Sequence, residues 1–554
     1  MSFCLLTQAW IPIRRASGGT QLMRPCDITD DLAGDPIVAL NWPRPDFQQA
    51  SLEFLIGLLA TAWPPPDNEN GWRSRWIRPP TPDTLQNAFL PFASAFDLDG
   101  AGPRFMQDFE DIDGAPSPVE TLLMEAPGFL TKKKNADHFT KRDTTATMCR
   151  AAAAMALFTL QAYAPSGGAG NRVGLRGGGP LTTLAVPPWH GVLPLWHLLW
   201  ANVPVGKVPT PKQMIRIFPW LTPTRTSDNG HMTTPSDVHD LQAYWGAPRR
   251  IRLAFSKNAN AMPCDIMGTT DTVDVRSWTQ RPNGASYALW HHPLSPYYRL
   301  KPTDTQWLPV HAQPGGVGYR HWIGFLVDDA SDNPTRRPAS TIQTFRQSRK
   351  RHLQDLDRNH WHMLAAGYDM DNMKARGFVE SEMTIIEPAE PGQEAEFNLL
   401  LRQMIEGAAA ASSLLSRAIR RALFSDGAKI PLDATMLATV RGRFWGATEP
   451  RFLQHIQKAA APGADIEKLR RAWLADLTLT VRRLFAESAP IDAKGANRRP
   501  ERLAAAGKSL NFSLTGFGKD GEAFWRKLGL ALPEKAGTRK APAKRMGQSK
   551  KAKP

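Results

Sequence analysis

The pattern of apolar residues changes at residues 387–392, EPAEPG, and this change divides the 554-residue chain into two regions. Beyond it, apolar side chains recur at the three- and four-residue spacing of one helix face over residues 397–424 and again over 466–484. Shorter helical patterns lie near residues 434–445, 451–460 and 499–510. This series of amphipathic helices predicts a C-terminal four-helix bundle over residues 393–530.

The region before residue 387 alternates short helical and strand patterns with long proline-rich connections. Residues 3–28 are typical of two strands joined by a turn at Gly18 and Gly19. An apolar helix is expected over residues 52–63, where three prolines follow, and an alanine-rich helix over residues 150–163. We therefore expect an α+β chain, in which a large irregular mixed α/β domain, residues 1–387, precedes the bundle.

The charge of the chain is unevenly distributed. The formal net charge is +16, and eight lysines or arginines with no acidic residue fall in residues 535–554, so half of the excess lies on this tail. A segment of this composition is expected to be disordered and to attract polyanions weakly. The excess on the rest of the chain fits a nucleic-acid partner without requiring one.

Cysteine usage and hydropathy point to a cytoplasmic protein. The four cysteines are far apart and form no C-x-x-C pair, so neither a disulfide framework nor a cysteine zinc site is expected, as suits a reducing compartment. The first residues lack a basic segment ahead of an apolar run, which argues against a signal peptide. No apolar stretch reaches the length of a membrane span.

Seven glycines surround Arg172 and Arg176 in residues 166–179, SGGAGNRVGLRGGG. Such a segment lets backbone N–H groups approach a partner closely, and the two arginines suggest an anionic partner. The glycine spacing imitates a dinucleotide fingerprint, but here a helix precedes and a strand (residues 181–186) follows, the reverse of the required order. A loop that presents its backbone to nucleic acid is favoured over a nucleotide site or an ordinary surface connection.

Catalytic signatures are scarce. No G-x-S-x-G, H-E-x-x-H or Walker sequence occurs, and the histidine pairs in residues 291–292 and 359–362 favour structural roles. The alternating carboxylates of residues 369–372 resemble a cation site, but Lys374 occupies the sixth position, where a calcium loop needs glycine. No metal site is predicted. The remaining alternative is a metal- or nucleotide-dependent nucleic-acid enzyme that uses these carboxylates or the glycines.

Two further segments have the composition of nucleic-acid contacts. The short segment containing Met373 and Lys374 combines an amide, an apolar side chain and a cation, which suits a base edge and its phosphate. The basic residues 132–134 are followed by Phe139, and charge with an aromatic ring is the mixture that holds a single-stranded backbone and stacks one base.

Six segments in this order resemble one known family. They are LLTQAWIPI at residues 5–13, FMQ at 105–107, KKNADHF at 133–139, VGLRGGGPLTT at 173–183, LWHHPLSP at 289–296 and GYDMDNMKAR at 367–376. Together they resemble the large subunit of the type I-E CRISPR Cascade complex, the CasA family. The resemblance extends from the first strand into the C-terminal bundle and leaves out the basic tail.

The resemblance implies a non-catalytic subunit without a cofactor. Such a subunit reads the protospacer-adjacent motif (PAM) of double-stranded DNA through the minor groove, starts strand separation and R-loop formation, and recruits a separate helicase-nuclease. Its implied partners are the crRNA, target DNA and the backbone, handle-binding and small subunits of the complex. Reading in the minor groove is degenerate, so several related motifs would be tolerated.

The resemblance also implies site residues by their positions in the motifs. The residues expected to face DNA are Gly168, Ala169, Gly170, Arg281, Asp371, Asn372, Met373 and Lys374. Those expected to hold the crRNA 5′ handle or a neighbouring subunit are Lys132, Lys133, Lys134, Asn135 and Phe139. Asn372 takes the place of a wedge that is glutamine in some relatives, and Ala169 replaces a glycine. The preferred base sequence of the motif is therefore left open.

Overall fold

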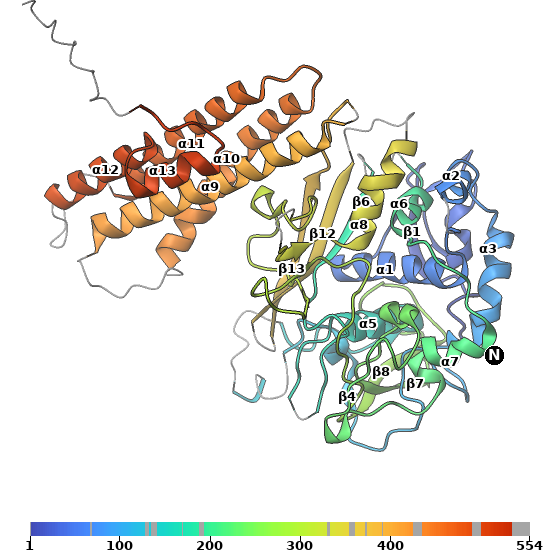
Figure 1. Ribbon diagram of the computed structural model, residues 1–554. Helices are drawn as coiled ribbons and strands as arrows, with labels where there is room; N and C mark the ends of the chain where they lie inside the picture. Colours follow the sequence, from blue (N-terminus) through green and yellow to red (C-terminus); the bar gives the residue numbers. More distant parts are fainter. Residues whose placement is uncertain are drawn as a thin grey trace, which may run out of the picture. The chain divides into compact units, whose positions relative to one another are not determined.

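The computed structural model describes residues 2–66, 69–127, 132–134, 141–168, 170–187, 193–329, 333–353, 361–371, 374–390, 392–424, 435–489 and 500–534. The chain forms two compact units, Met1–Glu387 and Pro388–Pro554 (Figure 1). The first unit contains both sheets and helices, and the second contains helices in its described segments. The predicted α+β class is confirmed, and the boundary between the units falls where the sequence pattern changes.

The chain begins with a small antiparallel sheet. Strands β1 (Ile11–Arg15) and β2 (Thr20–Met23) form the expected hairpin, and Gly18 adopts a φ of +91° in the turn between them. A third strand, β3 (Ile37–Leu40), pairs with the other edge of β1 in the order β2-β1-β3. The short apolar run IVAL gave no strand prediction because it has no alternation of polar and apolar residues.

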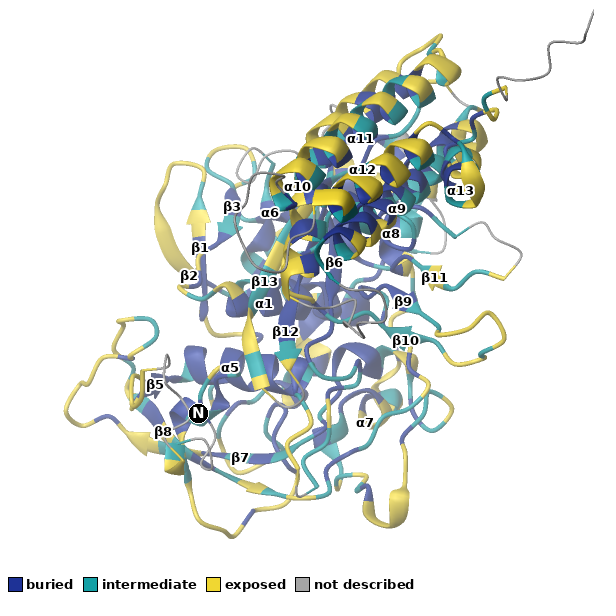
Figure 2. Ribbon diagram, turned by 90° about the vertical axis from the view of Figure 1, so that its left-hand side faces the viewer, coloured by how far each residue is buried: buried dark blue, intermediate teal, exposed yellow. Residues whose placement is uncertain are grey.

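Two helices form the centre of the first unit. Helix α1 (Pro45–Ala62) packs against α5 (Arg150–Tyr163), and both are buried over most of their length (Figure 2). Helix α1 starts seven residues before the predicted residue 52 because Pro45 occupies its first turn, where proline needs no N–H partner. The ring of Phe54 contacts an aromatic cluster of Trp10, Phe96, Phe105, Phe158 and Trp245.

An antiparallel sheet with the order β13-β12-β6 lies in the first unit. Strand β6 (Thr182–Val186) was predicted, and it pairs with β12 (His362–Asp371), which forms a long hairpin with β13 (Lys374–Thr384). His362 begins β12. Figure 1 shows strands β12 and β13 of this hairpin. Their pairing continues to Asp371↔Lys374.

The remaining strands of the first unit form two further sheets. The strands are β4 (Ser117–Pro118), β5 (Met148–Cys149), β7 (Arg250–Lys257), β8 (Val273–Arg281), β9 (Tyr297–Tyr298), β10 (Leu308–Pro309) and β11 (Arg336–Arg337). One sheet has the order β10-β9-β11, and in the other, four-stranded sheet β8 pairs with β4, β5 and β7. The shorter helices are α2 (Glu69–Ile77), α3 (Pro82–Phe89), α6 (Leu195–Asn202), α7 (Met214–Ile217) and α8 (Ser340–Thr344). Within the described segments, no helix has the length and apolar composition needed to cross a membrane.

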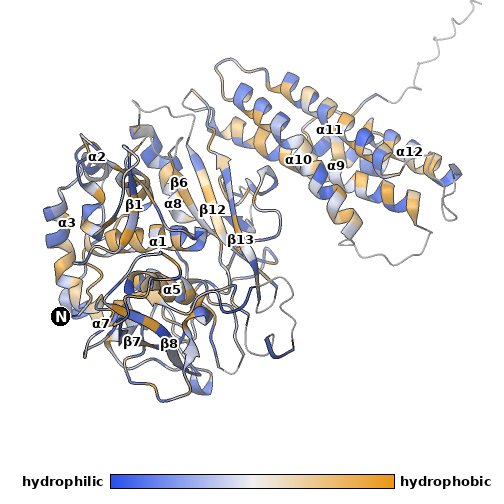
Figure 3. Cartoon of the chain, turned by 180° about the vertical axis from the view of Figure 1, so that it is seen from behind, coloured by the Kyte–Doolittle hydropathy of each residue, from blue (hydrophilic) through white to orange (hydrophobic). Residues whose placement is uncertain are grey.

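The second unit is built around one long helix. Helix α9 packs against each of the other helices described in this unit. Their bounds are α9 (Glu394–Leu423), α10 (Thr435–Ala459), α11 (Ile466–Ser488), α12 (Pro500–Leu514) and α13 (Gly518–Lys527). Hydrophobic and hydrophilic residues share these helices, as the spacing predicted (Figure 3). The indole of Trp473 is fully buried and donates to the carbonyl of Met404 at 3.0 Å.

The prediction of two separate helices over residues 434–445 and 451–460 was wrong. Helix α10 runs through Pro450, which cannot donate a hydrogen bond to the carbonyl of Gly446. Both residues are exposed, so water can reach that carbonyl, while Phe444 and Phe452 on either side remain buried. Burial of the apolar face therefore outweighs the local cost of proline. The short helix α13 was not predicted either.

A buried ion pair ties the glycine-rich segment to the centre of the first unit. Arg176 Nη2 lies 2.5 Å from Glu53 Oε2, and each side chain is 3% exposed. The other oxygen of Glu53 accepts hydrogen bonds from the Tyr163 and Thr182 hydroxyls. Burial raises the pKa of Tyr163 well above its ordinary value, as does the charge of Glu53, so the phenol stays protonated as a donor. Arg176 is therefore unavailable to an external anion, which corrects the expectation for this arginine.

Removing one partner of this pair is expected to destabilise the first unit. Arg176→Met leaves the Glu53 carboxylate buried without its counter-charge, which costs about 3–5 kcal/mol. The matched control is Arg172→Met in the same segment, because Arg172 is half-buried and donates to Ser227 Oγ. That change should cost under about 1 kcal/mol. Urea unfolding of the full-length protein, followed by tryptophan fluorescence, compares the two variants. Equal stability of the two variants would contradict the central role of the pair.

Candidate nucleic-acid interface

The glycine-rich segment leaves the C-terminal end of α5 as a tight loop, residues 165–171. Asn171 N donates to the Gly168 carbonyl at 2.7 Å, and Gly167 N donates to the Asn171 carbonyl at 3.3 Å. Gly168 has a φ of +64° and is exposed, and a Cβ on it would meet nothing within 4 Å. A left-handed, uncovered glycine at the tip leaves the backbone open to a partner. Ala169 lies outside the described residues.

Gly170 is held against the segment that follows β8. Its carbonyl accepts from Asn283 N at 2.9 Å, and its φ is +80°. A Cβ at this position would lie 2.7 Å from Asn283 N and 2.8 Å from Pro282 Cβ, so only glycine fits without movement. This contact places the loop next to the end of β8, where Arg281 lies. Three of the residues expected to face DNA, Gly168, Gly170 and Arg281, are thus brought together from distant parts of the chain.

The charge of Arg281 is only weakly paired within the protein. Its side chain is 38% exposed, and its nearest carboxylate, Glu110, is 3.7 Å away and half-exposed. On the neighbouring strand, Arg250 and Arg252 lie 2.5 Å from Asp108 and Asp111 respectively. A solvent-exposed ion pair with this separation contributes little to stability. The Arg281 guanidinium can therefore exchange Glu110 for a phosphate or a base edge.

The structure adds residues that the sequence did not single out. Arg249 lies beneath the glycine loop and donates to the Pro165 carbonyl at 2.5 Å, and burial lowers its pKa to about 10. The loop at residues 225–230 joins the same surface, because Ser227 N donates to the carbonyls of Asn283 and Gly284. Arg225 in this loop is exposed. The Asn-Gly pair at residues 229–230 is a turn signal close to Arg225 in the sequence, and it could have identified this loop.

The tip of the β12–β13 hairpin carries the second group of expected DNA contacts. Asp371 and Lys374 are both exposed and face each other across the hairpin. The two residues between them, Asn372 and Met373, lie outside the described residues. A connection of only two residues makes this end of the hairpin narrow.

The part of the hairpin nearest its tip rests on the far end of the glycine-rich segment. Gly179, with a φ of +63°, packs so closely that a Cβ would lie 2.5 Å from the Tyr368 carbonyl and 2.6 Å from Met370 Cγ. The hydroxyl of Tyr368 donates to the buried Asp46 at 2.5 Å. One segment of the chain therefore supports both the glycine loop and the hairpin.

The carboxylates considered as a cation site are otherwise engaged. Asp369 is buried and accepts two hydrogen bonds from Arg376, the shorter at 2.7 Å. Asp369 is thus a partner of Arg376, and its hydrogen bonds and charge, together with the charge of the exposed Asp371, raise the pKa of this arginine. Among the described residues, no group of three His, Cys, Asp or Glu side chains is arranged to hold a metal ion.

The three lysines of residues 132–134 differ in their surroundings. Lys132 Nζ lies 3.0 Å from Glu120 Oε2 and 3.4 Å from Asp143 Oδ1. Burial raises the pKa of Glu120, but hydrogen bonds from Thr144 and the hydrogen bond and charge of Lys132 lower it by more. The pKa of Glu120 is therefore below its ordinary value, and the carboxylate stays charged. Lys133 and Lys134 are exposed. The charge of Lys132 is compensated inside the protein, whereas Lys133 and Lys134 remain predicted RNA contacts. Asn135 and Phe139 lie outside the described part of the chain.

The chain is similar to known proteins in both sequence and fold. Residues 5–484 match the family model of the CRISPR-associated protein Cse1. CasA from Thermus thermophilus has a TM-score of 0.63 at 16% identity, covering 96% of this chain and 100% of that one. Cse1 from Acidimicrobium ferrooxidans has a TM-score of 0.62 at 17% identity, covering 96% and 98% respectively. A chain of a CRISPR RNA-guided surveillance complex has a TM-score of 0.66 at 14% identity, covering 93% and 99%. The fold is shared over nearly the whole length.

The different surroundings of the lysines predict different effects on stability. Lys132→Met should destabilise the first unit by about 1–3 kcal/mol, because it leaves the buried Glu120 carboxylate without its cation. Lys134→Met, two residues away on the exposed side, should change stability by less than about 0.5 kcal/mol. Urea unfolding of the full-length variants measures both. A larger effect at Lys134 than at Lys132 would show that the Glu120 pair is unimportant.

Proposed function

The chain belongs to the CRISPR-associated protein Cse1 family, and from this we propose that it is the large subunit of a crRNA-guided surveillance complex. In this role it recognises a PAM in double-stranded DNA through the minor groove and starts strand separation. A separate helicase-nuclease then acts on the opened DNA. The other partners are the crRNA and the backbone, handle-binding and small subunits. The subunit itself is non-catalytic and acts by binding.

The observation that carries this proposal is the joining of the glycine loop to the end of β8. The loop offers backbone N–H groups at an uncovered, left-handed glycine, and Arg281 adds a guanidinium beside it. The floor of the minor groove presents acceptors on every base pair and one donor, the guanine amino group. A thin backbone loop with a neighbouring cation suits this narrow groove, and it discriminates among bases only partly.

The hairpin supplies the step that follows recognition. Asn372 at its tip can donate to and accept from a base edge, Met373 adds an apolar contact, and Lys374 adds a cation for the adjacent phosphate. Inserting such a tip between base pairs costs a few kcal/mol of stacking. Pairing of the opened strand with the guide RNA offsets this cost. The hairpin therefore has to begin strand separation and does not have to complete it.

The exposed lysines Lys133 and Lys134 have a separate role in this proposal. They contact phosphates of the crRNA 5′ handle or a neighbouring subunit, together with Asn135 and Phe139. The alternative, a metal- or nucleotide-dependent enzyme, depends on carboxylates of residues 369–372 or on the glycine-rich segment, residues 166–179, which contains Arg176. Asp369 is engaged by Arg376, and Arg176 is engaged by Glu53. These pairings favour the binding role over the enzymatic one.

A side chain at the tip of the glycine loop should weaken recognition of the duplex. Gly168→Val adds a branched Cβ where the backbone would approach the groove floor, and we expect about 1–3 kcal/mol of lost affinity, roughly 5- to 150-fold. The matched control is Gly268→Val, because Gly268 also has a positive φ, +67°, and open space around it, away from this loop. Both variants carry the same backbone strain, so their difference reports contact with DNA.

The measurement is the affinity of the assembled complex for three targets: a duplex with a correct PAM, a duplex with a mutated PAM and a single strand. Gly168→Val should bind the correct duplex more weakly and leave single-strand binding unchanged, because guide pairing alone supplies the latter. If the variant discriminates the two duplexes as well as Gly268→Val does, the loop does not read the motif.

A further inference from the structure

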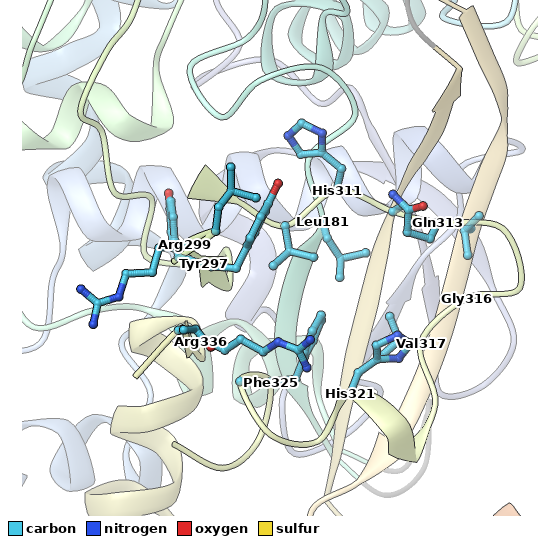
Figure 4. Close-up of a pocket in the computed structure, with 17 residues that line it drawn as sticks. Leu181, Tyr297, Arg299, His311, Gln313, Gly316, Val317, His321, Phe325 and Arg336 are labelled. Atoms are coloured by element: carbon cyan, nitrogen blue, oxygen red, sulfur yellow. The ribbon is translucent and has the colours of Figure 1, made fainter. Parts of the chain in front are cut away.

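A pocket of about 410 Å³ lies in the first unit beside the hairpin, and 17 residues line it (Figure 4). Its walls come from β9, from residues 310–317 and 321–325, from β11 and from β13. This volume is in the range of pockets that hold small organic molecules. None of the contacts that form the proposed PAM-reading surface uses this space.

The lining side chains are aromatic, basic and neutral. Tyr298 and Phe325 supply aromatic rings, His311 and His321 supply imidazoles, and Arg336 supplies a guanidinium with N–H donors. Phe325, the two histidines and Arg336 are labelled in Figure 4. Not one of the 17 lining residues is an aspartate or a glutamate. A pocket with this composition favours a flat, aromatic and negatively charged ligand over a cation or an aliphatic group.

The basic side chains of the pocket are not equally available to a ligand. Arg299 is fixed, because it donates to the carbonyls of Pro334 at 2.7 Å and Asp304 at 3.1 Å. Arg336 is exposed and extends along the pocket beside Phe325 (Figure 4). Within the described residues, no carboxylate forms an ion pair with Arg336. Burial lowers the pKa of His321 to about 4, and the nearby positive charges of Arg320 and Arg336 lower it too, so its ring is neutral at pH 7.

The pocket is connected to the hairpin along one strand. Val379 of β13 lines it, and Gly316 packs on the same face, where a Cβ would collide with Ser381 Oγ. Ala312 forms a bridge with Asp369, two residues before the end of β12. Val379 is five residues from Lys374, roughly 17 Å at about 3.3 Å per residue. At the stacked spacing of about 3.4 Å per nucleotide, this corresponds to about five nucleotides.

We propose that this pocket receives one unpaired nucleobase of the DNA that the hairpin opens, with the base between Tyr298 and Phe325 and its phosphate at Arg336. The proposal rests on the proposed function, because the base becomes available only when the duplex is opened. A base held in this way cannot pair again with its complement, so the pocket would stabilise the first opened nucleotides. The cost of extruding a base is a few kcal/mol and is smallest for a base that is already unpaired.

A matched pair of variants on β13 tests the pocket. Val379→Trp fills the space with a large ring, whereas Glu380→Trp adds the same ring to the adjacent exposed residue, whose side chain points to the opposite face of the strand. The target duplexes carry 2-aminopurine at one of the first six positions after the PAM, on either strand, because its fluorescence changes when the base leaves the stack. The assembled complex is used throughout.

With parental subunit, 2-aminopurine fluorescence should change at every opened position. At one position, Val379→Trp should alter this fluorescence change, whereas Glu380→Trp should leave it as in the parent. Val379→Trp should also lower the affinity of the complex for the target duplex about tenfold. If both tryptophan variants match the parent at every position, the duplex opens without the pocket and only the pocket proposal fails. If the parental complex opens no position, the proposed function fails as well.

A second arm distinguishes a base of the DNA from a free nucleotide, which shares the same chemistry. Full-length subunit alone is titrated with 2-aminopurine deoxyriboside 5′-monophosphate. Weak binding that Val379→Trp and Arg336→Gln abolish supports the pocket and its phosphate contact. Tight binding of the free monophosphate, without a Val379-dependent signal in the DNA, would show that the pocket serves a free nucleotide and would overturn base capture.

Discussion

The buried ion pair between Glu53 and Arg176 is the interaction on which the rest of the first unit depends. It joins the central helix α1 to the glycine-rich segment, and the hydroxyls of Tyr163 and Thr182 complete the coordination of the carboxylate. Burying two charges costs several kcal/mol per ion, so this pair contributes little net stability compared with apolar side chains of the same size. Its contribution is positional, because a glycine-rich segment has no side chains of its own with which to fix its path.

Fixing the middle of this segment determines where its two ends lie. Toward α5, the loop at Gly168 and Gly170 packs on the residues that follow Arg281. Toward β6, Gly179 packs under the hairpin that ends at Asp371 and Lys374. In the proposed function, the loop that reads the motif and the hairpin that opens the duplex are thus attached to the same anchor. Their spacing is set by the fold before DNA binds, which reduces the ordering cost of binding.

The sequence predicted the elements whose signals are local. Helix α5 has the predicted bounds, and β6 and the first hairpin were also predicted, because alanine content, β-branched residues and a Gly-Gly turn act over a few residues. The sequence could not show that Arg176 is internal, because its partner is 123 residues away. The sequence also could not show the contact between Gly170 and Asn283, because it is long-range. The same holds for the pairing of Lys132 with Glu120, because it depends on which side chains the fold brings together. Recognition of ordered motifs identified the candidate site residues, but only the fold showed which of them share a surface.

The central claim is that this subunit reads the PAM from the minor groove, and an inosine·cytosine pair tests it most directly. Such a pair presents the minor groove of A·T and the major groove of G·C, since inosine lacks the guanine amino group but keeps N7 and O6. The measurement is the affinity of the assembled complex for duplexes in which each motif pair in turn is A·T, G·C or inosine·cytosine. The account predicts that inosine·cytosine binds as A·T does at every discriminating position. Binding like that of G·C would place recognition in the major groove and contradict the account.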